Sequence, residues 1–226
     1  MRKYAWVMLI VFVASIASLS ISQPVGATEA NKETKVFELV DKAVNYMDLK
    51  QYQKAIDLLK QAIELDPDKA YLHKMLGNLY LMSRQYQKAA EELEQAVRLA
   101  PDDSYAHSAL GASYMWLQRN QEADEELKKA INLDPDNTHA HRVLGVLYIS
   151  IARHLKTAQE RFVQYQKAVE EFTLAVKLNP NDAYAHFNLG AAYILLGDKS
   201  SALEEYKILK NLDEGFANKL FKLIYK

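Results

Sequence analysis

A unit of 34 residues recurs along this chain and constrains its fold more than any other feature. In residues 104–137, apolar or small side chains recur every three or four residues on both sides of a polar turn at 118–120. This spacing predicts two amphipathic helices. Pro135 ends the second helix because proline has no N–H to donate, and Asp136 or Asn137 can cap the next helix. One such hairpin cannot bury its own apolar face, so we expect stacked copies.

Three markers locate the copies of this unit. The proline after the second helix recurs at intervals of 34, 34 and 45 residues, at Pro67, Pro101, Pro135 and Pro180. A small residue precedes a tyrosine by three positions in every first helix, and these pairs are Ala43 with Tyr46, Gly77 with Tyr80, Gly111 with Tyr114, Gly145 with Tyr148 and Gly190 with Tyr193. An alanine recurs in each second helix, at Ala55, Ala89, Ala123, Ala168 and Ala202. The chain therefore contains five units.

This pattern resembles the tetratricopeptide repeat family, whose unit reads Leu-Gly-x-x-Tyr, then Ala-x-x-x-Phe, then Pro. The resemblance extends from Val36 to about Glu214. The first aromatic of the family, usually Trp, is replaced by His73, His107, His141 and His186. The end units also depart from the pattern, as capping repeats do. The resemblance implies an all-α, right-handed superhelical solenoid of five helical hairpins plus a C-terminal capping helix.

We expect the repeat array to occupy residues 36–215. Its five units span about 36–69, 70–103, 104–137, 138–182 and 183–215. Residues 216–226 follow as the capping helix, with one apolar stripe made of Phe216, Leu220, Leu223 and Ile224.

The fourth unit is longer than the others because it carries an insert within residues 149–163. Helical spacing and the absence of Gly and Pro predict that the insert lengthens both helices of this hairpin by one to two turns. Its basic residues Arg153, Lys156 and Arg161 suit contact with membrane headgroups or an acidic partner. A plain solvated extension is the alternative.

Residues 1–27 differ in kind from the repeats. Arg2 and Lys3 precede an uncharged apolar run over residues 5–21, which is typical of a signal peptide. Small residues before Thr28 predict cleavage there. We therefore expect the repeats to be exported, to a periplasmic or extracellular location.

An uncleaved membrane anchor over residues 5–21 is the alternative interpretation of this segment. Its apolar run is at the lower limit of the roughly 17–25 residues that span a bilayer. Both interpretations place the repeats outside the cytoplasm, because the positive end stays inside. Residues 28–35 are polar and predict a flexible linker before the array.

Composition argues against several functional classes. The net charge is −1, so nothing attracts nucleic acid electrostatically. The chain has no cysteine, which excludes disulfides, a cysteine nucleophile and thiolate metal ligands. It contains no glycine-rich phosphate loop and no recognisable group of nucleophile, acid and base. We therefore expect no enzyme activity, no catalytic residue and no cofactor.

Four of the six histidines share one repeat position, which argues against a metal site. Equivalent positions on stacked helices lie about 8–10 Å apart, whereas zinc ligands lie within ~2.1 Å of the ion. We expect each ring to fill the space between two paired helices. Acidic pairs recur on the second helices and predict a solvated face; they are Glu91 with Glu92, Glu125 with Glu126, and Glu170 with Glu171.

The resemblance implies that the first helices line a concave groove. The candidate partner-binding residues in that groove are Tyr71, Lys74, Asn78, Tyr105, Met115, Arg142, Tyr184 and Phe187. Further exposed positions there include Ser108 and Ala112. Aromatic and methionine side chains are typical of adaptable protein-binding surfaces. The alternative is that helix packing, or the chain itself, fills part of this stripe.

Lys74 and Asn78 match the first pair of the carboxylate clamp by which some tetratricopeptide modules hold a partner's C-terminus. The match ends there, because the next unit has Ala109 and Ala112 where a further polar group would be needed, and the one after has His139 and Val143 where the family places basic residues. We do not expect a complete clamp.

These observations predict a non-catalytic scaffold or adaptor that binds a peptide or helix of a partner protein in its groove. The alternative function is a tightly bound subunit or assembly chaperone of an envelope or secretion enzyme complex. In either case we expect a protein partner, no nucleic acid, and membrane contact only through an uncleaved N-terminal segment. The sequence does not define the oligomeric state.

Overall fold

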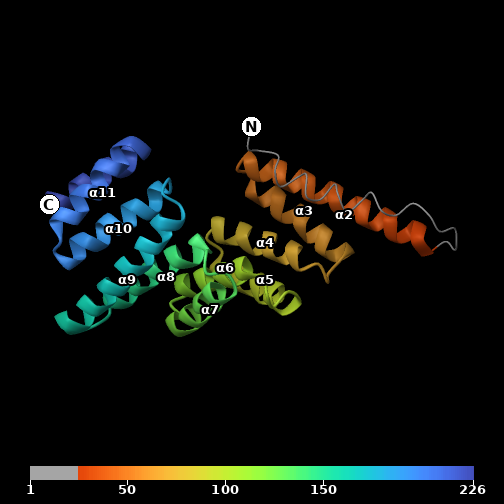
Figure 1. The fold of residues 1–226 in the computed structure, drawn as a ribbon. Helices are drawn as coiled ribbons and strands as arrows, with labels where there is room; N and C mark the ends of the chain where they lie inside the picture. Colours follow the sequence, from red (N-terminus) through yellow and green to blue (C-terminus); the bar gives the residue numbers. More distant parts are fainter. Residues whose placement is uncertain (1–24) are drawn as a thin grey trace.

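The computed structural model describes the backbone of residues 25–226, which forms eleven α-helices and no strand (Figure 1). The helices of this range are α2 (Val25–Asp48), α3 (Tyr52–Leu65), α4 (Ala70–Met82), α5 (Tyr86–Leu99), α6 (Ser104–Trp116), α7 (Asn120–Leu133), α8 (Thr138–Ala152), α9 (Ala158–Leu178), α10 (Ala183–Leu196), α11 (Lys199–Leu212) and α12 (Glu214–Ile224).

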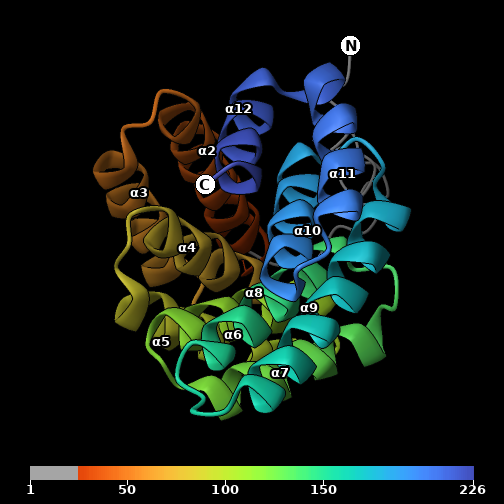
Figure 2. The ribbon, with the colours of Figure 1, turned by 90° about the vertical axis from the view of Figure 1, so that its left-hand side faces the viewer.

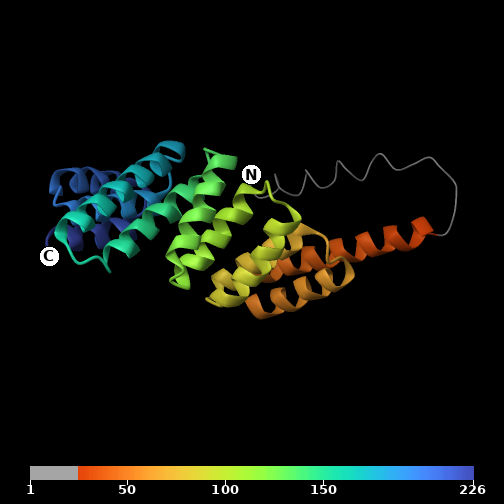
Figure 3. The same ribbon diagram turned by 90° about the horizontal axis from the view of Figure 1, so that it is seen from below.

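Consecutive helices pair into five hairpins, from α2 with α3 to α10 with α11, and α12 closes the array. The hairpins form an elongated row in chain order when the molecule is seen from below (Figure 3). Viewed toward the C-terminal end, the same hairpins wind around a common axis (Figure 2). The predicted all-α solenoid of five hairpins with a capping helix is confirmed.

The first helices of the hairpins lie on the inner side of the curve. Helices α4, α6, α8 and α10 contact one another in succession, and α12 continues this row by packing on α10. In the described range, successive second helices do not contact one another. The row of first helices, which contact one another, is therefore shorter than the row of second helices, which do not. This difference makes the array curve, with the first helices on its concave face.

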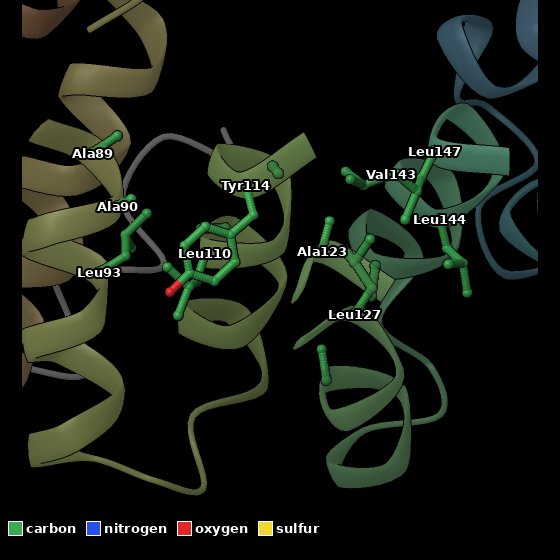
Figure 4. Packing of buried hydrophobic residues seen from close by; sticks show 14 of the residues in the cluster. Ala89, Ala90, Leu93, Leu110, Tyr114, Ala123, Leu127, Val143, Leu144 and Leu147 are labelled. Carbon is green, nitrogen blue, oxygen red and sulfur yellow. The ribbon is translucent and has the colours of Figure 1, made fainter. Parts of the chain in front are cut away.

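The core runs continuously through neighbouring hairpins (Figure 4). Leu110 of α6 and the second-helix residues Leu93 and Leu127 are buried within it. Glycine at the repeat position lets the paired helices approach closely. A Cβ placed on Gly111 would lie 2.6 Å from Cγ of Leu127, well inside van der Waals contact.

Individual residues determine where helices begin and where the hairpins turn. The Asn137 side chain accepts a hydrogen bond from the backbone N–H of Ala140, which confirms a predicted N-cap. Three hairpin turns each contain one residue in the left-handed region, with φ between 57° and 61°; these are Lys50, Arg84 and Gln118. The fifth hairpin has Gly197 at this position.

The structure differs from the predicted linker at residues 28–35. These residues belong to α2, which begins at Val25. The segment contains no Gly or Pro after Gly26 and consists largely of good helix formers. Lys32 also forms an ion pair with Asp66 at 3.4 Å, which ties this turn to the array.

The predicted signal peptide or anchor lies almost wholly in residues 1–24, outside the described residues. Among the described helices, none combines the length and apolarity that crossing a membrane requires.

The fourth hairpin also differs from its prediction. Helix α8 has 15 residues and α9 has 21, against 13 in α6 and 14 in α7. The insert therefore lengthens mainly the second helix, by about two turns. Thr157 starts α9 with a reciprocal capping box: its hydroxyl accepts from the N–H of Glu160, whose carboxylate accepts from the N–H of Thr157.

Candidate functional site: the concave groove

Three of the predicted groove residues present exposed aromatic rings. Tyr71, Tyr105 and Tyr184 are each the second residue of a first helix, in α4, α6 and α10. Their exposed fractions are 43%, 57% and 41%. The repeat thus places similar amphipathic rings along the inner row of helices.

A pocket of about 390 Å³ lies on the concave side, between α4 and α10. It brings together three of the predicted residues, Met115, Arg142 and Tyr184. Val146 of α8 and Ala112 of α6 contribute to its lining. Small-ligand pockets commonly have volumes of about 300–1,000 Å³, so this one can hold a large side chain with the backbone beside it.

The remaining predicted residues, Tyr71, Lys74, Asn78, Tyr105 and Phe187, do not line this pocket. Lys74 is engaged within the array, since its Nζ lies 2.5 Å from Oδ2 of Asp103, the N-cap residue of α6. Burial, the largest single effect, would raise the pKa of Asp103, but the hydrogen bond and charge of Lys74 together with backbone hydrogen bonds from Ala106 and Tyr105 lower that pKa. Lys74 therefore serves the contact between neighbouring hairpins.

The capping helix covers the C-terminal end of the aromatic stripe. The ring centroid of Phe216 lies 5.3 Å from that of Phe187 and 5.8 Å from that of Tyr184. Phe187 is therefore half-buried against α12. At this end the chain itself fills the stripe, which was the alternative interpretation of these positions.

The prediction that Ser108 and Ala112 of α6 are exposed in the groove is wrong. Ser108 is fully buried and Ala112 is 6% exposed, because α6 is contacted by both α4 and α8. His139 of α8 covers Ser108, with Nδ1 3.1 Å from Oγ. Burial and the nearby charge of Arg142 lower the pKa of His139 to about 4, so its ring is neutral at neutral pH.

Several pocket residues were not predicted from the sequence, among them Met82, Arg84, Tyr86 and Trp116. The Tyr86 and Trp116 rings stack with centroids 5.2 Å apart and planes 8° from parallel, and Trp116 is 57% exposed. Arg84 lies in a hairpin turn and Tyr86 at the start of a second helix. The sequence offered one signal for this part of the pocket: Trp116, a large aromatic residue, directly follows the predicted groove residue Met115.

The four repeat histidines make one set of contacts. In each case Nε2 lies 2.9–3.0 Å from the carbonyl oxygen of the preceding unit's terminal proline. Nδ1 lies 2.5–2.7 Å from a second-helix glutamate, and the pairs are His73 with Glu92, His107 with Glu126, His141 with Glu171, and His186 with Glu205. The prediction of a wholly solvated acidic face is therefore wrong for Glu92, Glu126 and Glu171.

These contacts occupy both nitrogens of each ring, so each histidine bridges its own hairpin and the turn before it. No group of three or more histidine or carboxylate side chains that could hold a metal ion occurs in the described part of the chain.

Comparisons with known proteins agree with this architecture. Residues 46–113 match the tetratricopeptide repeat family, and residues 116–194 match the family described as regulator of microtubule dynamics protein 1-3. None of the curated proteins compared with the chain matches it.

Solved structures with a similar fold include three helical repeat proteins. PilF of Pseudomonas aeruginosa has a TM-score of 0.69 at 17% identity, covering 85% of this chain and 84% of its own. MamA has a TM-score of 0.60 at 22% identity, covering 81% of this chain and 94% of its own. YrrB, described as a TPR protein with an unusual peptide-binding site, has a TM-score of 0.57 at 22% identity, covering 86% and 97%.

The repeat pattern, the five stacked hairpins and these likenesses lead to one conclusion. The chain folds as an all-helical solenoid of stacked hairpins like those of tetratricopeptide repeat proteins, and its residues 46–113 match that family.

Proposed function

We propose that this protein is a non-catalytic scaffold or adaptor whose concave groove binds a peptide or helix of a partner protein. The observation that carries the proposal is the pocket on the inner row of helices, where the exposed rings of Trp116 and Tyr184 flank an apolar lining. A few aromatic anchors in such pockets commonly supply most of the binding energy. The unusual peptide-binding site of YrrB is consistent with this use of the fold.

Capture of partners from the native cell tests this proposal. The groove variant combines Tyr71→Ala, Tyr105→Ala and Trp116→Ala, all on exposed rings, so helical content and melting should change little. The control combines Leu155→Glu and Phe162→Glu in the insert, away from the groove. We expect the groove variant to lose the captured proteins and the insert variant to keep them. The reverse pattern would assign binding to the fourth hairpin.

A stable subunit or assembly chaperone of an envelope complex is the second candidate. The projecting first turns of α9 favour it, because Phe162 and Val163 are exposed there outside the groove. Adjacent exposed apolar side chains can form part of a protein–protein interface. Gel filtration of the detergent-solubilised native protein distinguishes the two functions. A subunit would elute in a stoichiometric complex, whereas an adaptor would elute alone because its partners dissociate during the run.

We also propose that the protein is exported and acts in a periplasmic or extracellular location. The support is the charged start and apolar run of residues 1–27. N-terminal sequencing of the native protein should give a first residue near Thr28. A soluble cytoplasmic form that keeps Met1 would contradict export, whereas Met1 in the membrane fraction would indicate the uncleaved anchor.

A further inference from the structure

The pocket on the concave face is positively charged. Two guanidinium groups, those of Arg84 and Arg142, belong to its lining, and no carboxylate does. Arg142 has a distant ion-pair partner, with Nη1 3.9 Å from Oδ2 of Asp182, and its guanidinium carbon lies 5.0 Å from the Tyr184 ring centroid. Arg84 forms no ion pair with any other described residue. The net charge of −1 for the whole chain makes this local excess of positive charge distinctive.

The pocket lining also includes a hydrogen-bond acceptor on His139. The Ser108 hydroxyl donates to the carbonyl oxygen of Tyr105 at 3.0 Å, so its oxygen accepts from Nδ1–H of His139. The ring of His139 is neutral, so Nε2 carries a lone pair and accepts. An acidic residue within a peptide offers a carboxylate that can pair with the arginines and a backbone N–H that can donate to Nε2 of His139.

The remaining wall of the pocket is apolar and aromatic. The stacked Tyr86 and Trp116 rings and the side chain of Met82 form it. Flat rings and methionine accommodate a large aliphatic or aromatic side chain. The charged and apolar parts of the lining thus lie within a single pocket.

We propose that this pocket is a specificity site that recognises an acidic side chain adjacent to a large apolar side chain in the partner peptide. The inference rests on the proposed function and adds the chemistry of the ligand to it. The pocket shares His139 and Val143 with the positions of the carboxylate clamp, but Lys74 and Asn78 do not line it, and its two arginines stand at other positions. Arg84 lies in the turn between α4 and α5, and Arg142 lies in α8.

Selection from a displayed library of random peptides tests the proposal with the full chain. The wild-type protein should enrich peptides that carry Asp or Glu beside an aromatic or aliphatic residue. The variant Arg84→Gln/Arg142→Gln should lose the acidic preference and keep the apolar one. Arg98→Gln, on an exposed arginine of α5 outside the pocket, is the matched control and should behave as wild type.

A synthetic version of the enriched peptide then gives the size of the effect. Hydrogen bonds to charged groups correspond to roughly tenfold to hundredfold in affinity, so we expect a loss in that range for the double variant and for a peptide with Asn in place of Asp. The wild-type affinity should fall as salt is raised. If the double variant is poorly folded, Arg84→Gln alone supplies the comparison, because this side chain is exposed on a turn.

Four results would overturn the proposal. Enriched peptides without an acidic preference, or an acidic preference that the double variant keeps, would remove this ligand chemistry and leave groove binding intact. Binding that disappears when only the peptide's C-terminal carboxylate is amidated would assign the site to a chain end instead of a side chain. A wild-type protein that enriches no peptide would contradict the proposed function together with this inference.

Discussion

Each repeat histidine forms a hydrogen bond with a glutamate at the position where the family usually has an indole. Both ring nitrogens of His141 face acceptors, the carboxylate of Glu171 and the carbonyl oxygen of Pro135. An imidazole that donates from both nitrogens is the protonated form. The hydrogen bond to Glu171 is the largest cause that raises the pKa of His141, and it outweighs the opposing effect of burial. Asp134 adds to the same shift.

This ion pair should make stability depend on pH. Because the folded pKa of His141 is raised, its contribution to the free energy of unfolding is fully present below the unfolded pKa of about 6.5 and is lost as pH rises through the folded value. Urea denaturation of wild type and of Glu171→Gln should therefore show a stability difference that is largest below about pH 6.5 and shrinks as the pH is raised above it. A difference that stays constant as the pH is raised would show that His141 is neutral.

The hairpin turns offer a second prediction at this scale. Gln118 has φ of 61°, a conformation that costs an L-residue about 1 kcal/mol. Gln118→Gly should raise the free energy of unfolding by a few tenths to about 1 kcal/mol, because glycine, which the fifth hairpin has at this position as Gly197, adopts this conformation without strain. Gln121→Gly, within α7, is the control and should lower it by about 1 kcal/mol. Equal effects of both changes on thermal melting would contradict this role of the turn conformation.

Among the elements, α9 departs most from the repeat. Its first turns extend beyond the neighbouring hairpins, and two devices hold them: the Thr157 capping box, and Arg161 donating to the carbonyl oxygens of Leu155 and Lys156. The pattern Thr-x-x-Glu was visible in the sequence and would have placed the start of α9.

Removing the cap should loosen only this extension. We expect Thr157→Ala to cost about 1 kcal/mol locally and to speed amide hydrogen exchange over residues 158–163. The melting temperature of the whole array should change little, because these turns bury few side chains. Unchanged exchange at these amides would show that packing, and not the cap, holds the first turns.

At Gly111, where paired helices approach closely, we expect a substitution to destabilise the whole array and not only one segment. Gly111→Leu places a side chain where even a Cβ would meet Leu127, and overpacking of this kind costs about 1–3 kcal/mol. The loss should spread to neighbouring hairpins, because repeats stabilise one another through their interfaces. Lys129→Leu, on the exposed face of α7, should stay within about 0.5 kcal/mol of wild type. Equal melting of the two variants would contradict the register of the repeat.

At the scale of the whole molecule, the repeat predicted the hairpins well because the contacts within a hairpin are local in sequence. The groove was harder to predict. Arg84 and Trp116 line the same pocket only because separate hairpins stack, and a pattern within one unit cannot show this. The burial of Phe187 depends on how α12 packs against α10, and the burial of Ser108 on contacts from both sides of α6.

The fluorescence of Trp116 tests the central claim, binding in the concave groove, most directly. Trp116 and Trp6 are the two tryptophans, so Trp6→Phe leaves the pocket residue as the sole indole of the full chain. Titration with a labelled peptide from the selection should change Trp116 emission in step with the rise in the peptide's anisotropy, because the ligand covers an exposed ring. A saturating rise in anisotropy with unchanged Trp116 emission would place the peptide elsewhere and contradict binding in the groove.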